Sequence, residues 1–145
     1  MSPPRLVLDT NIVLDLLHYT QNEAQPLLPA LMAGDCIALA DERTLDELER
    51  VVTYPQFGMD AATGQALVAR YRQTIEMVAA GDPPPLPRCK DRDDQKFLEL
   101  AARGQAEALI SKDKALLKLR GRRTLGFAIY PPAEAVVWLA TRTGA

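Results

Sequence analysis

The segment Leu6-Val-Leu-Asp-Thr-Asn-Ile-Val13 is the most informative part of this 145-residue chain for its fold class. Its apolar start, closed by Asp9, is typical of a short buried strand. Thr10 and Asn11 are favourable N-cap residues for a helix that carries Ile12, Leu14, Leu16 and Leu17. A buried strand that leads directly into a helix is the opening unit of an α/β domain.

The same alternation of strand and helix continues along the chain. Apolar segments predict further strands over residues 36–40, 107–111 and 126–130. Helical patterns predict helices over residues 22–33, 41–52, 61–80, 91–103, 113–119 and 131–138. The proline-rich segment 81–87 predicts an extended connection. Because no two-residue hairpin signal separates the strands, we expect a mainly parallel sheet. No repeat or second domain is visible, so we expect one domain over residues 1–145.

Composition narrows the class of protein. Hydrophobic residues make up 48% of the chain and charged residues 25%, which excludes a disordered or collagen-like chain. One His and two Cys without C-x-x-C spacing argue against a zinc site or a disulfide scaffold. No secretory signal and no run of ~20 apolar residues is visible, so we expect a cytoplasmic protein without membrane contact.

Acidic residues fall where the strands end. Asp9 closes the first strand, and Asp113 follows the apolar core of the third. Because parallel strands end at one edge of the sheet, both carboxylates are expected there. Asp94 lies in the first turn of the helix over 91–103, and Glu47 borders the apolar face of the helix over 41–52. These four acids are the candidate site.

Four carboxylates at one edge repel each other, and burial there removes their hydration. A hard cation with oxygen ligands, Mg²⁺ or Mn²⁺, would compensate, and such an ion suits phosphate chemistry. Each acid also has an alternative role as a helix cap, a partner of the helix dipole or a solvated charge. The spacing of the acids leaves both interpretations open.

Four blocks of the sequence, in the same order, closely resemble the PIN-domain family. They are residues 6–13 with Asp-Thr-Asn, 47–57 with Glu47, 91–101 with Asp91-Arg-Asp-Asp94, and 108–117 with Asp113. The ending over residues 129–135 is also typical of the family. The resemblance extends over essentially the whole chain. It is closest to bacterial members described as toxins of toxin–antitoxin systems, relatives of the VapC toxins.

This resemblance implies a three-layer α/β/α fold and a metal-dependent endoribonuclease. Asp9, Glu47, Asp94 and Asp113 match the acids that bind Mg²⁺ or Mn²⁺ and activate a water, which leaves a 5′-phosphate and a 3′-hydroxyl. Asn11 and Ser111 match polar positions that support the acids, although Thr is commoner than Ser at the second position. In the Asp-rich block, Asp91 and Asp93 compete with Asp94 for the third place, and the register against Phe97 favours Asp94 over Asp91. A cognate antitoxin and a homodimer are the partners implied.

Charge is distributed unevenly along the chain. Residues 1–85 hold 5 Lys and Arg against 12 Asp and Glu, whereas residues 86–145 hold 12 against 7. A cationic rim around Asp94 and Asp113 would attract an RNA backbone with salt-dependent, largely sequence-blind affinity. The residues expected to contact RNA are Arg92, Lys96, Lys112 and Lys114. Ordinary solvated charge is the alternative, and an aromatic content of 6% leaves base specificity unpredicted.

Other classes of acidic α/β protein fit less well. A catalytically silent PIN module that serves as a scaffold for RNA or protein would be expected to lose acids, but this chain retains all four. A haloacid-type phosphatase requires Asp two residues after its nucleophile, where this chain has Asn11. A receiver domain requires an acid pair just after its first strand, and the sequence shows none.

Overall fold

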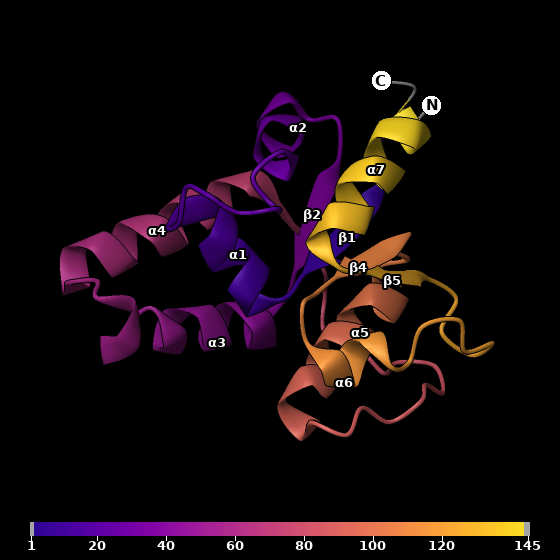
Figure 1. Cartoon of the computed structure of the whole chain (residues 1–145). Helices are drawn as coiled ribbons and strands as arrows, with labels where there is room; N and C mark the ends of the chain where they lie inside the picture. The colour runs from indigo at the N-terminus through magenta and orange to yellow at the C-terminus, as the bar shows by residue number, and fades with distance from the viewer. Residues whose placement is uncertain (1, 144–145) are drawn as a thin grey trace.

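A five-stranded, entirely parallel sheet of order β3-β2-β1-β4-β5 organises the computed structural model, which describes residues 2–143 (Figure 1). The strands are β1 Arg5–Leu8, β2 Ile37–Ala40, β3 Ile75–Met77, β4 Ala108–Ile110 and β5 Ala128–Tyr130. β1 lies at the centre and pairs with β2 and β4, through Leu6 with Ala38 and with Ala108. The predicted parallel sheet is confirmed.

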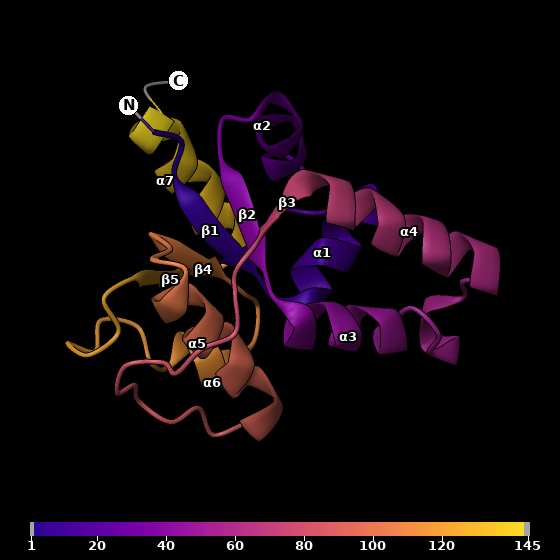
Figure 2. The same ribbon diagram turned by 180° about the vertical axis from the view of Figure 1, so that it is seen from behind.

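Helices cover both faces of the sheet (Figure 2). They are α1 Thr10–Leu17, α2 Leu27–Ala33, α3 Glu42–Val51, α4 Ala61–Thr74, α5 Gln95–Arg103, α6 Lys114–Leu117 and α7 Pro132–Thr143, with 3-10 turns η1 Pro55–Phe57 and η2 Arg92–Asp94. The longest, α4, has 14 residues. Within residues 2–143, no helix has the length and apolar character needed to cross a membrane.

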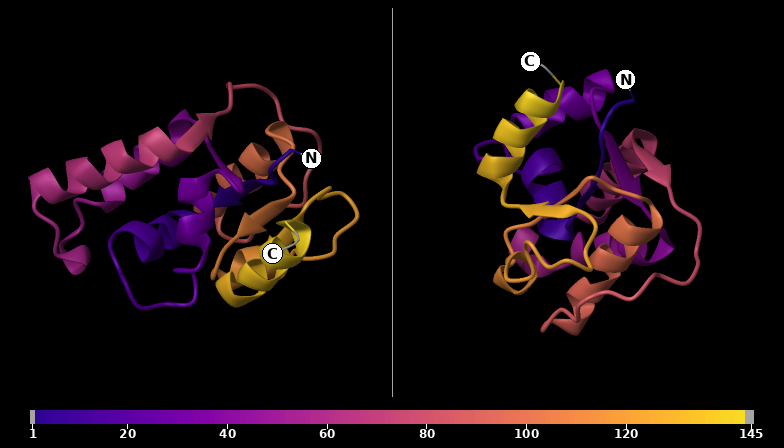
Figure 3. Two further views of the ribbon diagram at one scale, coloured as in Figure 1. Left: turned by 90° about the horizontal axis from the view of Figure 1, so that it is seen from above. Right: turned by 90° about the vertical axis from the view of Figure 1, so that its right-hand side faces the viewer.

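Alternate residues of β1 divide the interior into two apolar clusters, because successive strand side chains point to opposite faces. Leu6 and Leu8 pack on one face with α1, α2, α3, α4 and α7. Val7 packs on the other face with α5 and α6. The two clusters and the sheet between them make the three-layer α/β/α arrangement that the sequence resemblance implied. Figures 1 and 3 show α3 and α4, which contact each other, extending together beyond the sheet.

The strand β3 was not predicted, since the helix over residues 61–80 was expected to be continuous. The helix α4 instead ends at Thr74, and Ile75–Met77 pairs with Ala38–Ala40 of β2. The Val78 N–H then donates to the Ala40 carbonyl at 2.8 Å. β-branched residues at 74, 75 and 78 weaken a helix, and the open edge of β2 supplies partners for the backbone instead.

Smaller differences concern the ends of helices. α2 begins at Leu27 rather than residue 22, since Asn22 closes a turn by accepting the Ala24 N–H at 3.1 Å. α7 continues to Thr143, beyond the predicted end at residue 138. Residues 92–94 form a 3-10 turn before α5, because the Asp91 carboxylate accepts the Asp93 N–H at 3.0 Å. This turn brings Asp91 and Asp94 close together.

Candidate metal centre

Three carboxylates converge beyond the carboxyl end of the sheet. Asp91, Asp94 and Asp113 each offer an oxygen, and these three oxygens lie within 4.8 Å of one another. Asp91 caps the start of the turn η2 and Asp94 is the last residue of that turn, whereas Asp113 follows β4 and caps α6 by accepting the Ala115 N–H at 2.7 Å. The group contains two of the four acids proposed from the sequence, together with Asp91, the alternative to Asp94. We call these three residues the acidic cluster.

Asp94 is the least compensated member of the acidic cluster. Its Oδ2 atom is buried and has no hydrogen-bond partner within residues 2–143. Burial raises the pKa of Asp94 well above its ordinary value, and so do a hydrogen bond to Asp113 and the charges of Asp113, Asp91 and Asp9. A buried carboxylate oxygen without a donor, facing two further carboxylates, matches the all-oxygen ligand set that a hard divalent cation prefers.

Asp9 lies buried beside the acidic cluster, with 4% of its surface exposed. Its Oδ1 accepts the Ile12 N–H at 3.0 Å, and its Oδ2 accepts a hydrogen bond from the Ser111 hydroxyl. Burial raises the pKa of Asp9 to about 6, partly offset by these two hydrogen bonds. The Ser111 hydroxyl also accepts the Asp113 N–H at 2.9 Å, so one side chain joins β1 to the cap of α6.

Glu47 is placed differently from the other acids. Its Oε1 lies 2.6 Å from the Lys96 ammonium, and its Oε2 accepts a hydrogen bond from the Thr10 hydroxyl. The side chains of Lys96 and Glu47 are only 13% and 17% exposed. This ion pair joins α3 to α5 and neutralises Glu47, which lies outside the acidic cluster.

Two supporting contacts come from residues that sequence reasoning missed. Thr10 contacts Glu47, whereas its neighbour Asn11 is exposed and makes no side-chain hydrogen bond to an acid in the described chain. Asp15, which is 8% exposed, forms an ion pair with Lys112 at 2.5 Å. The signal for Thr10 was its place directly after Asp9, where the helix starts. No sequence signal pointed to Asp15.

The four side chains expected to contact RNA divide into two pairs. Lys96 and Lys112 are engaged with Glu47 and Asp15. Arg92 and Lys114 are exposed, and neither forms an ion pair within residues 2–143. Only the second pair is therefore free of an acidic partner in the described part of the chain.

Comparison with known proteins adds one finding to this geometry. The family model of the PIN domain matches residues 5–115, a span that runs from β1 into α6 and contains the acidic cluster, Asp9 and Glu47. No curated protein matches the chain.

Proposed function

This chain belongs to the PIN-domain family, whose members are generally nucleases, and on that premise we propose that it is a metal-dependent endoribonuclease. The observation that carries the proposal is the acidic cluster, because carboxylates this close repel each other and a cation between them would relieve that repulsion. We propose RNA as the substrate and hydrolysis of its phosphodiester bonds as the reaction.

Asp94, Asp113 and Asp91 would hold the ion, with Asp9 as a further charge beside them. Their oxygens suit Mg²⁺ or Mn²⁺, since no His or Cys ligand is in the group. When bound, such an ion supplies an activated water and stabilises negative charge on the phosphoryl oxygens. Asp94 contributes the buried oxygen that has no hydrogen-bond partner in the described part of the chain.

Asp9 and Ser111 orient the site. Both oxygens of Asp9 accept hydrogen bonds, from Ile12 and from Ser111, so the carboxylate cannot rotate freely. Ser111 also fixes the backbone of Asp113. Hydrogen bonds behind the ligands of a metal site commonly affect metal affinity or activity by about 10–100-fold. Ser111 therefore serves to position two of the acids rather than to react.

The proposed biological role is the toxin of a bacterial toxin–antitoxin pair, acting as a single-domain homodimer that a cognate antitoxin protein binds. This role is supported by the resemblance of the four sequence blocks to VapC-like members of the family. Cytoplasmic action follows from the proposed RNA substrate.

A cleavage assay tests the nuclease proposal. Purified protein is incubated with a mixed pool of single-stranded RNA and Mg²⁺ or Mn²⁺, and the ends of the products are identified. We expect metal-dependent cleavage that EDTA stops, with 5′-phosphate ends, and loss of activity in Asp9→Asn with the circular dichroism spectrum unchanged. Intact RNA after incubation with folded, metal-supplied protein would contradict the proposal, as would full activity of Asp9→Asn.

The Lys96–Glu47 ion pair favours a second candidate function, a catalytically silent PIN module that acts as a scaffold for RNA or protein. In that case, one of the four acids is neutralised permanently and the site binds no metal. Calorimetric titration with Mn²⁺ separates the two functions, because the nuclease requires binding that Asp94→Asn abolishes, whereas the silent module gives no signal.

A further inference from the structure

We propose that Arg88 and Arg92 form a phosphate-binding pocket next to the acidic cluster, which holds the RNA backbone beside the bond to be cleaved. The inference rests on the proposed ribonuclease function and specifies how the same site would contact its substrate. A phosphate group is the chemistry recognised, because two guanidinium groups match its oxygens in geometry and charge.

A cavity of about 550 Å³ lies at this place. Its lining consists of Arg88, Cys89, Arg92 and Gln95. Arg92 begins the turn η2, directly after Asp91 and two residues before Asp94, so the wall of the cavity includes the turn that carries two acids of the cluster. A backbone phosphate in the cavity would place a neighbouring phosphate close to the acids.

The Gln95 side chain holds the loop that carries Arg88 through two hydrogen bonds. Its side-chain oxygen accepts the Cys89 N–H at 2.7 Å, and its amide nitrogen donates to the Pro87 carbonyl at 3.2 Å. Arg88 stands between these two anchored residues, and its side chain is exposed. The backbone at the pocket is thus fixed before a ligand arrives, which lowers the entropy lost on binding.

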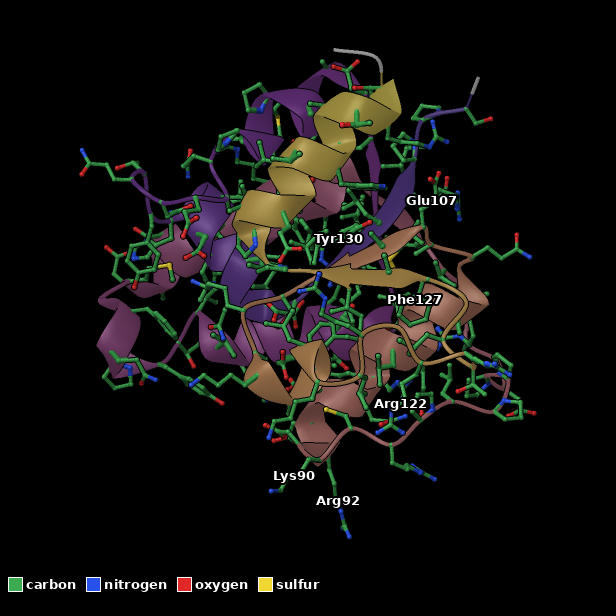
Figure 4. All side chains as sticks on the ribbon, turned by 45° about the vertical axis from the view of Figure 1, so that its right-hand side comes forward. Lys90, Arg92, Glu107, Arg122, Phe127 and Tyr130 are labelled. Atoms are coloured by element: carbon green, nitrogen blue, oxygen red, sulfur yellow. The ribbon has the colours of Figure 1, made fainter. Side chains whose placement is uncertain are left out.

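The two arginines are free to meet an anion. Five other basic residues of the C-terminal half form ion pairs: Lys96, Arg103, Lys112, Arg120 and Arg142. Within residues 2–143, neither Arg88 nor Arg92 has an acidic side chain as an ion-pair partner. Figure 4 shows the Arg92 side chain extending outward beside Lys90, on the side of the molecule where Arg122 also lies. Phosphate contact here would displace no internal ion pair.

A phosphate pocket has a consequence for selectivity. Contacts to phosphate carry no information about base or sugar, so the pocket should strengthen the binding of single-stranded RNA and DNA equally. Any preference for RNA must then arise at other residues.

Fluorescence anisotropy on end-labelled oligonucleotides tests the pocket. The affinity for a single-stranded RNA and for a DNA of the same sequence is measured in Ca²⁺ across a range of salt concentrations, with a gel to verify that the oligonucleotide stays intact. The test variant is R88A/R92A. The control is R50A/R70A, which removes two exposed arginines of α3 and α4 that have no ion-pair partner in the described chain. R88K/R92K retains the charge.

We expect R88A/R92A to bind both oligonucleotides on the order of tenfold more weakly. The slope of log affinity against log salt concentration should fall by about 1.4, since each lost phosphate contact accounts for about 0.7 on a single strand. The control should stay near wild type, whereas R88K/R92K should keep the salt slope but bind more weakly than wild type, because an ammonium group cannot contact two phosphate oxygens as a guanidinium does. The pocket proposal would be wrong if R88A/R92A bound with wild-type affinity, or if R50A/R70A lost as much affinity. It would also be wrong if R88A/R92A lost affinity for RNA alone. If the wild type binds but cleaves no RNA while R88A/R92A binds more weakly, the nuclease proposal fails and the pocket stands.

Discussion

The buried carboxylate of Asp41 and the partly exposed acidic cluster both lie near the carboxyl end of the sheet, and they are compensated in opposite ways. After β2, the Asp41 carboxylate caps α3 by accepting the Thr44 N–H at 2.9 Å and forms an ion pair with Arg103 at 2.9 Å. After β4, Asp113 meets Asp94 and Asp91 without a basic partner in the described chain. The first acid has a structural role, whereas we propose that the second group takes a cation from solution.

The largest effect on stability is expected at Asp41, the acid that has an internal ion-pair partner. Arg103→Met leaves Asp41 buried without its partner, because the two side chains are only 8% and 5% exposed. Removing one member of a buried ion pair destabilises a protein by about 3–5 kcal/mol. We expect that loss in urea denaturation monitored by circular dichroism. A free energy of unfolding within about 1 kcal/mol of wild type would show that the hydrogen bond from Thr44 is enough to stabilise the buried Asp41 carboxylate.

Substitutions in the acidic cluster should lower RNA cleavage rather than the stability of the fold. Asp94→Asn removes a proposed ligand, and we expect RNA cleavage to fall by at least ~100-fold, the upper end of what partners behind metal ligands contribute. The metal-free variant should be as stable as wild type or more so, because the amide can donate to Asp113 where the carboxylate repels it. Steady-state kinetics measures the fall in RNA cleavage, and thermal unfolding in EDTA measures the stability of the metal-free variant. A variant that cleaves normally would remove Asp94 from the site.

Lys96 tests whether Glu47 belongs with the compensated or the uncompensated acids. Lys96→Met removes the ammonium 2.6 Å from Glu47, and the apolar stem of the side chain is retained. If Glu47 is close enough to join the ion, Mn²⁺ affinity should tighten by about tenfold. Calorimetric titration measures this, with Lys118→Met as a control at an exposed lysine. Unchanged affinity would place Glu47 permanently in a structural role.

The smallest effect expected is a dependence of stability on pH. Asp9 has its pKa raised to about 6, and the pKa of Asp94 is also raised, so the folded protein binds more protons than the unfolded chain above pH ~4. The stability of the metal-free protein should therefore fall as the pH rises through this range. We expect Tm in EDTA to be a few degrees lower at pH 8 than at pH 5, and Mn²⁺ to restore it mainly at pH 8. A Tm in EDTA that rises between these pH values would contradict this.

Much of the fold could be predicted because the pattern is local. The apolar run before Asp9 and the capping residues after it are contiguous, and they determine β1 and the start of α1. β3 could not be predicted, since residues 75–77 follow a helical pattern and are held as a strand only by pairing with β2. A helical register already places Asp91 and Asp94 on one face, three residues apart, but their approach to Asp113 depends on how this segment packs against the end of β4.

The sequence by itself determined that Asp9 and Asp113 follow parallel strands and so approach the same edge, because strand direction and chain order follow from local patterns. Tertiary packing, in contrast, sets which acids gain a hydrogen-bond or ion-pair partner from a distant part of the chain. Asp41 meets Arg103 across 62 positions of the chain, and Ser111 reaches Asp9 across 102. Such pairings depend on how helices pack over the sheet, and no local propensity encodes them. That packing leaves Asp94 with a buried oxygen that meets no donor among residues 2–143.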